Sequence, residues 1–342
     1  MKILAVRLGS MGDVIHTLPA VALLKRGFPR AEVTWAVESR WAPLLDENPF
    51  VDCVLPLPIA KWRKNPLGRE TRTEFSMARR QLRGAHFDLA VDFQGLLKSA
   101  AVTFFSRADR VLGFDRRELR EPLAATFYSN RVFTGAPHVV ERCLRLASAA
   151  GAHIADARDA APVFSLPQGV PEPPLPPGEF VLTSPVAGWT SKQWPAEHYV
   201  ALAGRIWREC QMPLVVDCAP AEVEVARLIV GRAQPGSCVL HPSSLAGLIA
   251  ATRRARAVIG VDSGPLHLAA ALRKPGVALF GPTDPARNGP FGGSLRVLRL
   301  PHAQTSYKRE DQIHPAMASL HPDEVWQALR PLLSADRTPV PM

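Results

Sequence analysis

Short apolar runs rich in β-branched residues alternate with longer segments of helical spacing along the whole chain, and this alternation most restricts its possible folds. In the first half, the predicted strands span residues 3–6, 33–37, 53–55, 89–91 and 111–112. In the second half, they span residues 180–183, 214–217, 239–240, 258–261, 277–280 and 297–300. A helix between successive strands gives right-handed crossovers and a mainly parallel sheet with both faces covered. The alternation therefore predicts an α/β protein.

The segments between these strands have the apolar spacing of helices. In the first half, the predicted helices span residues 14–26, 40–46, 74–83, 96–105 and 139–150. In the second half, they span residues 196–210, 222–232, 245–254, 266–272 and 323–333. We expect the last of these helices to pack back on the first half of the chain. Each half has enough strands and helices for a Rossmann-like α/β/α domain.

A proline-rich stretch separates the two halves. Seven prolines lie within residues 162–178, and such a segment can form neither a helix nor a central strand. We therefore predict two Rossmann-like domains, residues 1–161 and 179–342, joined by a stiff linker. Ligands of open parallel sheets bind beyond the carboxyl ends of the strands, so two facing domains predict a site in the central cleft between them.

Composition excludes several classes of protein. The 342 residues are 47% hydrophobic and 21% charged, which argues against a disordered or fibrous chain. No apolar run reaches the ~18 residues of a membrane helix, and the first apolar run is too short for a secretory signal. The five cysteines are widely spaced and form no Cys-x-x-Cys pair, so they predict neither a disulfide framework nor a zinc site. We expect a cytoplasmic protein.

Positive charge is concentrated in the first half of the chain. Residues 1–170 hold 24 basic and 17 acidic side chains, a net charge of +7, whereas residues 171–342 hold 17 and 14, a net charge of +3. The excess is densest over residues 61–83, which contain eight basic side chains and two acidic ones. Such a stretch is typical either of a solvated helix or of a site for a polyanion. With only Trp62 near its centre, it gives no support to base stacking.

The first predicted strand leads through Gly9 and Gly12 to Asp13, where a helix begins. Aspartate is a favoured cap at such a position and stabilises a helix by about 1 kcal/mol. A carboxylate held there by backbone amides could also act as a general base. The spacing alone leaves both interpretations open. The loop lacks Gly-x-Gly-x-x-Gly, which disfavours dinucleotide redox chemistry.

Two loops in the second half combine features of a phosphate site. After the strand at 258–261, Asp262 and Ser263 precede a helix whose free amides and dipole favour an anion such as a diphosphate. After the strand at 180–183, Lys192 lies between two tryptophans and could direct its charge at a leaving phosphate. A plain capping turn and a surface lysine are the alternatives.

Six motifs occur in order on this α/β framework, and together they are specific. They are SMGDVIHTLPA at 10–20, WRK at 62–64, DFQGLLKS at 92–99, REPLA at 120–124, DSG at 262–264 followed by His267, and GPTDP at 281–285. With these motifs the chain resembles glycosyltransferase family 9, the heptosyltransferases of lipopolysaccharide inner-core synthesis. The resemblance is greatest to type I, which adds the first heptose to the Kdo residues on lipid A. It implies the GT-B fold, in which two Rossmann-like domains face each other across a central cleft.

The resemblance also implies a reaction and roles for individual residues. The reaction is an inverting transfer of heptose from ADP-L-glycero-β-D-manno-heptose to a Kdo hydroxyl, with Asp13 as the general base. The residues implied in donor binding are Thr190, Ser191, Lys192, Glu222, Asp262, Ser263, Gly264 and His267. Among them, Lys192, Ser263 and Gly264 hold the diphosphate, Glu222 the ribose and Asp262 the sugar. The residues implied in acceptor binding are Lys61, Arg63, Lys64, Arg120 and Arg142.

The partners follow from the same resemblance. They are ADP-heptose, Kdo-lipid A and the anionic cytoplasmic face of the inner membrane, and nucleic acid is not expected. The more basic first half would face the acceptor and the second half the nucleotide. No Asp-x-Asp pair occurs in the chain, so we expect neither a metal ion nor another cofactor.

Three alternatives remain. The chain could be heptosyltransferase II or another family 9 glycosyltransferase, because these share nearly all the motifs. It could be a GT-B nucleotide-sugar epimerase, which needs no acceptor. It could also be a non-catalytic binder of nucleic acid or another polyanion through residues 61–83, which a gel shift would reveal.

Overall fold

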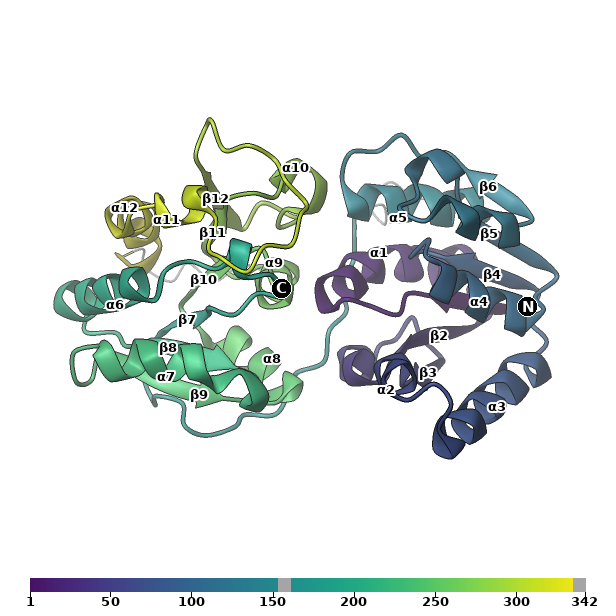
Figure 1. The fold of residues 1–342 in the computed structure, drawn as a ribbon, viewed down its shortest axis with the longest axis horizontal. Helices are drawn as coiled ribbons and strands as arrows, with labels where there is room; N and C mark the ends of the chain where they lie inside the picture. The colour runs from purple at the N-terminus through teal and green to yellow at the C-terminus, as the bar shows by residue number, and fades with distance from the viewer. Residues whose placement is uncertain (153–160, 335–342) are drawn as a thin grey trace. The chain divides into compact units, whose positions relative to one another are not determined.

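The computed structural model describes residues 1–152 and 161–334, which divide into two compact units, Met1–Pro167 and Gln168–Met342. The boundary lies within the proline-rich stretch. Each unit is a parallel sheet with helices on both faces, so the α/β prediction is confirmed (Figure 1). Among the described residues, no helix is long and apolar enough to cross a membrane.

The N-terminal unit contains a six-stranded sheet in the order β3-β2-β1-β4-β5-β6. Its strands are β1 (Lys2–Val6), β2 (Glu32–Glu38), β3 (Cys53–Leu57), β4 (Leu89–Asp92), β5 (Arg110–Phe114) and β6 (Asn130–Val132). The sequence pattern missed β6, because this edge strand has three residues, two of them polar and exposed. The strand order reverses between β1 and β4, which is the switch point where open sheets bind ligands.

The helices of this unit are α1 (Met11–Gly27), α2 (Ile59–Lys64), α3 (Arg69–Gly84), α4 (Leu97–Ser106) and α5 (Val139–Ala149). Helix α1 packs along α5. The helix predicted at 40–46 is instead a 3-10 helix, Ser39–Leu45, because Pro43 inside it cannot donate an α-helical hydrogen bond. Further 3-10 turns cover Arg116–Glu118 and Pro122–Phe127.

The C-terminal unit contains the sheet β12-β11-β10-β7-β8-β9. Its strands are β7 (Val181–Ser184), β8 (Leu214–Cys218), β9 (Cys238–Pro242), β10 (Ala257–Val261), β11 (Gly276–Phe280) and β12 (Leu295–Arg299). Its helices are α6 (Ala196–Cys210), α7 (Val223–Arg232), α8 (Leu245–Arg254), α9 (Gly264–Ala271), α10 (Pro285–Asn288), α11 (Pro315–Ala318) and α12 (Pro322–Ser334). The switch point lies between β7 and β10.

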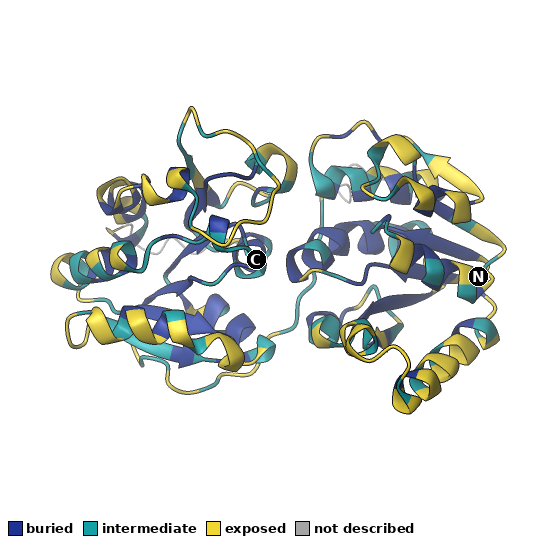
Figure 2. Cartoon of the chain, viewed as in Figure 1, coloured by how far each residue is buried: buried dark blue, intermediate teal, exposed yellow. Residues whose placement is uncertain are grey.

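The central strands of the C-terminal unit are buried (Figure 2), and aliphatic and large aromatic side chains fill its core. The indole of Trp194 packs edge-on against Tyr199 with ring centroids 4.8 Å apart, and its N–H donates to the carbonyl of Leu320 at 2.8 Å. Trp326 brings α12 into the same core. Within its own unit, α12 contacts α6, β10 and β11, and the packing of this helix on the first domain stays a prediction.

Candidate functional site

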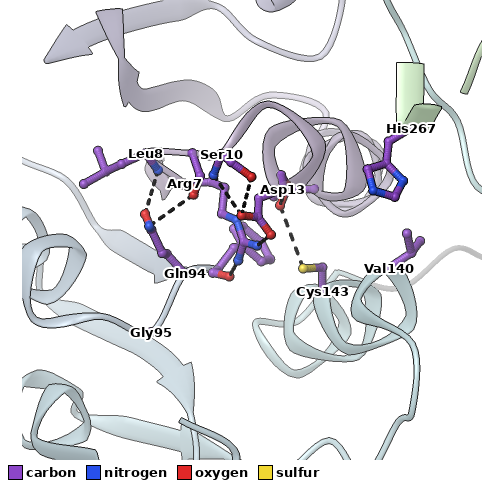
Figure 3. Close-up of polar contacts among 12 residues, drawn as sticks. Arg7, Leu8, Ser10, Asp13, Gln94, Gly95, Val140, Cys143 and His267 are labelled. Carbon is purple, nitrogen blue, oxygen red and sulfur yellow. Dashed lines mark hydrogen bonds and ion pairs between the residues drawn. The ribbon is translucent and has the colours of Figure 1, made fainter. Parts of the chain in front are cut away.

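Asp13 lies at the carboxyl edge of the N-terminal sheet, at the switch point (Figure 3). The cap of α1 is Ser10, and Asp13 is the third residue of the helix. Its carboxylate Oδ2 accepts hydrogen bonds from the Ser10 backbone N–H at 2.8 Å and from the Ser10 hydroxyl at 3.0 Å. The prediction of a carboxylate tied to the start of this helix is therefore confirmed, with Ser10 rather than Asp13 as the cap residue.

Arg7 forms an ion pair with the other oxygen of Asp13. The side chain of Arg7 is 8% exposed, and its guanidinium also donates to the carbonyl of Phe93. Burial alone would raise the pKa of Asp13, but the charge of Arg7 and the hydrogen bonds from Ser10 outweigh it and hold this pKa below its usual value. Asp13 is therefore an anion at neutral pH with 31% of its side chain still exposed.

Gln94, in the loop after β4, holds the loop that precedes Asp13, and Asp92 at the end of β4 fixes the loop of Gln94. The side chain of Gln94 accepts from the Leu8 N–H at 2.9 Å and donates to the Gly9 carbonyl at 3.2 Å. Gly9 has φ +147°, and a Cβ there would lie 2.8 Å from the Trp41 indole, so glycine is required. Asp92 is fully buried and accepts four hydrogen bonds from its own loop, Ser99 and Tyr128, yet burial raises its pKa.

Lys98 is a cation of this region to which the sequence analysis gave no role. It lies in the first turn of α4, and its ammonium makes no ion pair within residues 1–152 and 161–334. Partial burial lowers its pKa; the charge of Glu38 opposes this effect and that of Arg63 adds to it. The charge of Asp13 also acts on Lys98. A positive charge near the candidate base can hold an anionic acceptor.

The predicted acceptor residues divide into paired and unpaired cations. Lys61 is paired, because its ammonium contacts Glu70 at 2.6 Å and Glu74 at 2.7 Å. Hydrogen bonds to these carboxylates raise its pKa. Arg63 and Lys64, on the same short helix α2, are exposed and have no ion pair among the described side chains.

Arg120 and Arg142 differ in the same way. Arg120 is exposed and unpaired within the described part of the chain. Arg142 is half-buried on α5, donates to the carbonyl of Glu118 at 2.9 Å and lies 5.0 Å from the centre of the Phe114 ring. The Nε of Arg142 also lies 3.7 Å from the carboxylate of Glu118. Arg142 thus has a packing role that its place in the sequence did not indicate.

In the C-terminal unit, Lys192 and Asp262 meet across the switch point. Lys192 lies in the loop after β7 and Asp262 directly follows β10, and their charged groups are 2.6 Å apart. The lysine ammonium also lies 4.3 Å from the centre of the Trp189 ring. Burial would raise the pKa of Asp262, but hydrogen bonding to His267 and the charge of Lys192 lower it well below its usual value. The predicted lysine and aspartate therefore form one charged pair.

Ser263, Gly264 and His267 form the start of α9 beside this pair. Ser263 is the residue before the helix and Gly264 its first residue. The Ser263 hydroxyl is buried and has no hydrogen-bond partner in the described ranges. His267 is buried, with its Nε2 3.5 Å from Asp262. Free amides and a free hydroxyl beside a cation form the arrangement that an anionic ligand needs.

The loop after β7 continues through Thr190 and Ser191, which share a single 3-10 turn with Lys192. Ser191 is buried, its carbonyl accepts from the His314 N–H at 3.3 Å, and its hydroxyl has no partner among the residues described. The hydroxyl of Thr283, after β11, is also buried without a partner there. Three free hydroxyls thus follow three adjacent strands. The loop that contains Thr283 was expected from its GPTDP motif, but a role for this side chain was not.

Two more residues lie at this edge of the sheet. Glu222 is exposed in the turn after β8, directly before α7, and has no ion pair among the described residues. Arg309 was not predicted; its guanidinium lies 5.5 Å from the Trp189 ring that Lys192 also faces. No group of three or more His, Cys, Asp or Glu side chains that could hold a metal ion occurs in the part that the structure describes.

Comparisons with known proteins agree with this arrangement. A family model described as glycosyltransferase family 9 (heptosyltransferase) matches residues 76–316. Lipopolysaccharide heptosyltransferase 1 of Pseudomonas aeruginosa is 36% identical over 306 residues, which cover 86% of this chain and 82% of that protein. Its counterpart from Escherichia coli K12 is 32% identical over 314 residues, covering 88% and 94%. The solved structure of E. coli heptosyltransferase WaaC with ADP-2-deoxy-2-fluoro heptose superimposes with a TM-score of 0.78, at 28% identity, over 97% of this chain and 99% of that one.

Proposed function

Because the chain belongs to glycosyltransferase family 9, the heptosyltransferase family, we propose that it transfers L-glycero-D-manno-heptose from ADP-heptose to a Kdo hydroxyl of Kdo-lipid A. The transfer builds the inner core of lipopolysaccharide and inverts the anomeric configuration of the heptose. The fold, with two Rossmann-like units, is the GT-B fold of WaaC. Relatives named heptosyltransferase 1 include chains that are 30–36% identical, whereas two named heptosyltransferase 2 are 27% identical, which favours type I.

The observation that carries this proposal is the Lys192–Asp262 pair beside the start of α9. A nucleoside diphosphate leaving group gains negative charge as the bond to the sugar breaks. Lys192, the α9 amides and the Ser263 hydroxyl offer positive charge and hydrogen-bond donors to it. Asp262 and His267 would accept hydrogen bonds from the sugar, Glu222 from the ribose, and the loop of Thr190 and Ser191 would close around the diphosphate.

Asp13 provides the base in this proposal. The acceptor hydroxyl attacks the anomeric carbon, its proton passes to the carboxylate, and the bond between that carbon and the diphosphate breaks to release ADP. A carboxylate has about four lone-pair directions. Ser10 uses two on Oδ2 and Arg7 uses one on Oδ1, so one direction on Oδ1 is left for the acceptor.

Unpaired cations of the N-terminal unit are suited to an anionic acceptor. Arg63, Lys64 and Arg120 are exposed without ion pairs among the described residues, and Lys98 adds a charge near Asp13. We assign these residues to the carboxylates and phosphates of the acceptor. Lys61 and Arg142 are already paired with glutamates, which fix the positions of their charged groups. From these fixed positions they would contribute to acceptor binding.

We further propose that the reaction needs no metal ion or other cofactor. Lys192 supplies a positive charge of the kind that a divalent ion would bring to the diphosphate, and the sequence has no Asp-x-Asp pair. Activity should survive EDTA; a loss restored by Mg²⁺ or Mn²⁺ would contradict this.

We also propose that the enzyme works at the cytoplasmic face of the inner membrane. The net charge of +7 over residues 1–170, from 24 basic and 17 acidic side chains, supports this location because the membrane surface is anionic.

The test is release of ADP from ADP-heptose, measured with and without Kdo-lipid A. The proposal predicts release that depends strictly on the acceptor. Release without an acceptor, or conversion of the donor to an isomer, would favour the epimerase alternative. A requirement for an acceptor that already carries one heptose would indicate type II, and inactivity combined with a gel shift on DNA would favour a polyanion binder.

A further inference from the structure

Apart from Lys98 in its first turn, the solvent side of α4 is apolar. Leu97, Ala101, Phe104 and Phe105 have the spacing i, i+4, i+7 and i+8, which places them on one side of the helix. Leu97 is 43% exposed and Phe104 59% exposed, while the buried residues of α4 lie on the opposite side. A helix of a water-soluble unit normally turns polar residues outward, so this face is unusual.

The apolar face continues onto the neighbouring elements through aromatic contacts. Phe104 packs edge-on against Phe127 of the turn Pro122–Phe127, with ring centroids 5.8 Å apart. Leu123 in the same turn is 68% exposed. On the other side, Phe105 packs edge-on against Phe75 of α3 at 5.4 Å. The result is one contiguous surface over α3, α4 and this turn, and these helices lie side by side in the N-terminal unit (Figure 1).

Arginines border the apolar surface on the α3 side. Arg72, Arg79 and Arg83 are spaced i, i+7 and i+11, so they share one side of α3. The guanidinium of Arg79 lies 5.6 Å from the centre of the Phe105 ring. Burial lowers the pKa of Arg83, and the nearby charges of Arg107 and Arg79 lower it further. None of these four arginines has an ion pair in the described parts of the chain.

From these contacts we propose that the surface formed by the outer side of α4, the turn Pro122–Phe127 and the arginine side of α3 docks on an anionic lipid bilayer. Phenylalanine and leucine side chains enter the boundary between headgroups and acyl chains, and the arginines contact the lipid phosphates. The inference rests on the proposed function, because it states which part of the chain meets the membrane that carries the acceptor.

The chemistry of the surface favours a bilayer over nucleic acid. The rings meet edge to face, with interplanar angles of 66° for Phe104 on Phe105 and 85° for Phe75 on Phe105, so they offer no series of parallel faces to bases. A bilayer satisfies both properties of the surface at once, because it takes up exposed apolar side chains and neutralises unpaired arginines.

Vesicle co-sedimentation of the full chain tests the proposal without any sugar transfer. The vesicles are pure phosphatidylcholine or a mixture of phosphatidylcholine and phosphatidylglycerol. One variant carries Phe104→Ser and Leu123→Ser, and a second carries Arg79→Gln, Arg83→Gln and Arg107→Gln. The matched controls are Leu228→Ser, an exposed leucine of α7, and a triple Arg208→Gln, Arg232→Gln and Arg296→Gln variant of the C-terminal unit. Melting curves and donor turnover with an acceptor that lacks acyl chains confirm that each variant is folded.

The wild-type chain should bind the anionic vesicles more tightly than the neutral ones. Each arginine removed should weaken this binding about fivefold. The Phe104 and Leu123 variant should lose about tenfold or more on both vesicles, and the controls should bind as the wild type does. Equal binding by folded variants and wild type would overturn the proposal. The proposal would also be overturned if the wild type did not bind vesicles but self-associated, and if the Phe104 and Leu123 variant abolished that self-association. The vesicle assay measures binding alone, so its result stands even if the chain proves not to transfer heptose.

Discussion

At the residue scale, the pair of Arg7 and Asp13 decides how the proposed base, Asp13, can be tested. An asparagine at position 13 can still accept the hydrogen bonds from Ser10, but it leaves the charge of Arg7 buried without an anion. Breaking a fully buried pair costs about 3–5 kcal/mol, and the 31% exposure of Asp13 makes the cost here smaller. Asp13→Asn should therefore lower the melting temperature as well as kcat.

A double variant separates the two effects. In Asp13→Asn with Arg7→Gln the buried charge is gone, so the melting temperature should rise towards that of the wild type. If Asp13 is the base, kcat of both variants should remain about 10²–10⁴-fold below that of the wild type. If the stable double variant recovers substantial turnover, Asp13 serves only the structure of the loop.

Lys192 gives the second prediction at this scale. Replacing it with methionine removes one charge-assisted contact to the diphosphate, worth about 1.5–3 kcal/mol, or roughly 10–150-fold in donor binding. The KM for ADP-heptose should rise and the KM for the acceptor should change little. Lys192→Arg keeps the charge beside Asp262 and should retain more activity than Lys192→Met. Unchanged donor kinetics in folded Lys192→Met would exclude the residue from the site.

Residue types and spacing drew attention to Asp13, Lys192 and Asp262, but they did not reveal that Arg7 pairs with Asp13. Arg7 directly follows the buried strand β1, and only the structure reveals its contacts with Asp13 and Phe93. The ion pairs of Lys61 with two glutamates were equally hidden, because they join separate helices. Contacts between elements depend on how the elements pack, and residue types and spacing in a single sequence do not reveal that packing.

At the element scale, the strands were predictable because each central strand is a short apolar run. The errors occur where that signal is weak. Strand β6 has three residues, and the short helix α2 lies in a stretch whose charge pattern dominates its apolar residues. The segment Ser39–Leu45 has the spacing of a helix, but Pro43 restricts it to a 3-10 conformation.

A histidine joins three elements of the C-terminal unit and predicts a pH effect. His241 on β9 is buried, its Nδ1 lies 2.8 Å from Asp217 of β8, and its Nε2 lies 3.0 Å from the carbonyl of Glu172 in the proline-rich stretch. Burial would lower its pKa, but the hydrogen bonds to Asp217 and Glu172 and the aspartate charge raise it above the usual value. The protonated imidazole thus donates to both partners.

Because the folded pKa is raised, this stabilisation is fully present below the unfolded pKa of about 6.5 and is lost as the pH rises through the folded pKa. The melting temperature of the wild type should therefore exceed that of His241→Asn by more at pH 6 than at pH 9. A difference that stays constant over this range would show that His241 is neutral in the folded unit. His302→Asn, an exposed histidine on a loop, is the matched control.

Helix α2 carries the prediction for the acceptor. Replacing Arg63 and Lys64 with alanine should raise the acceptor KM and leave the donor KM nearly unchanged, because both are exposed cations without ion pairs in the described residues. The effect should diminish with salt, since the Debye length falls from ~10 Å at 0.1 M to ~3 Å at 1 M. Arg208→Ala with Arg232→Ala removes equal charge from the C-terminal unit as a control. An equal change in both KM values would make α2 a structural element.

At the scale of the whole molecule, the division into two α/β units follows from the repeated strand-helix pattern and the proline-rich stretch between the halves. The division of charge has a chemical meaning on the same scale. The N-terminal unit combines Asp13, the proposed base, with exposed cations and an apolar surface bordered by arginines, which suits a phosphorylated lipid acceptor. The C-terminal unit combines a buried charged pair with free hydroxyls and a helix start, which suits a nucleoside diphosphate.

Inverting heptose transfer is the central claim, and the configuration of the product tests it most directly. The purified chain is incubated with ADP-L-glycero-β-D-manno-heptose and Kdo-lipid A, and the new glycosidic bond is examined by NMR. The account predicts one heptose on a Kdo hydroxyl in the α configuration, opposite to that of the donor. A β-linked product, free heptose, or an isomerised nucleotide sugar without transfer would contradict it.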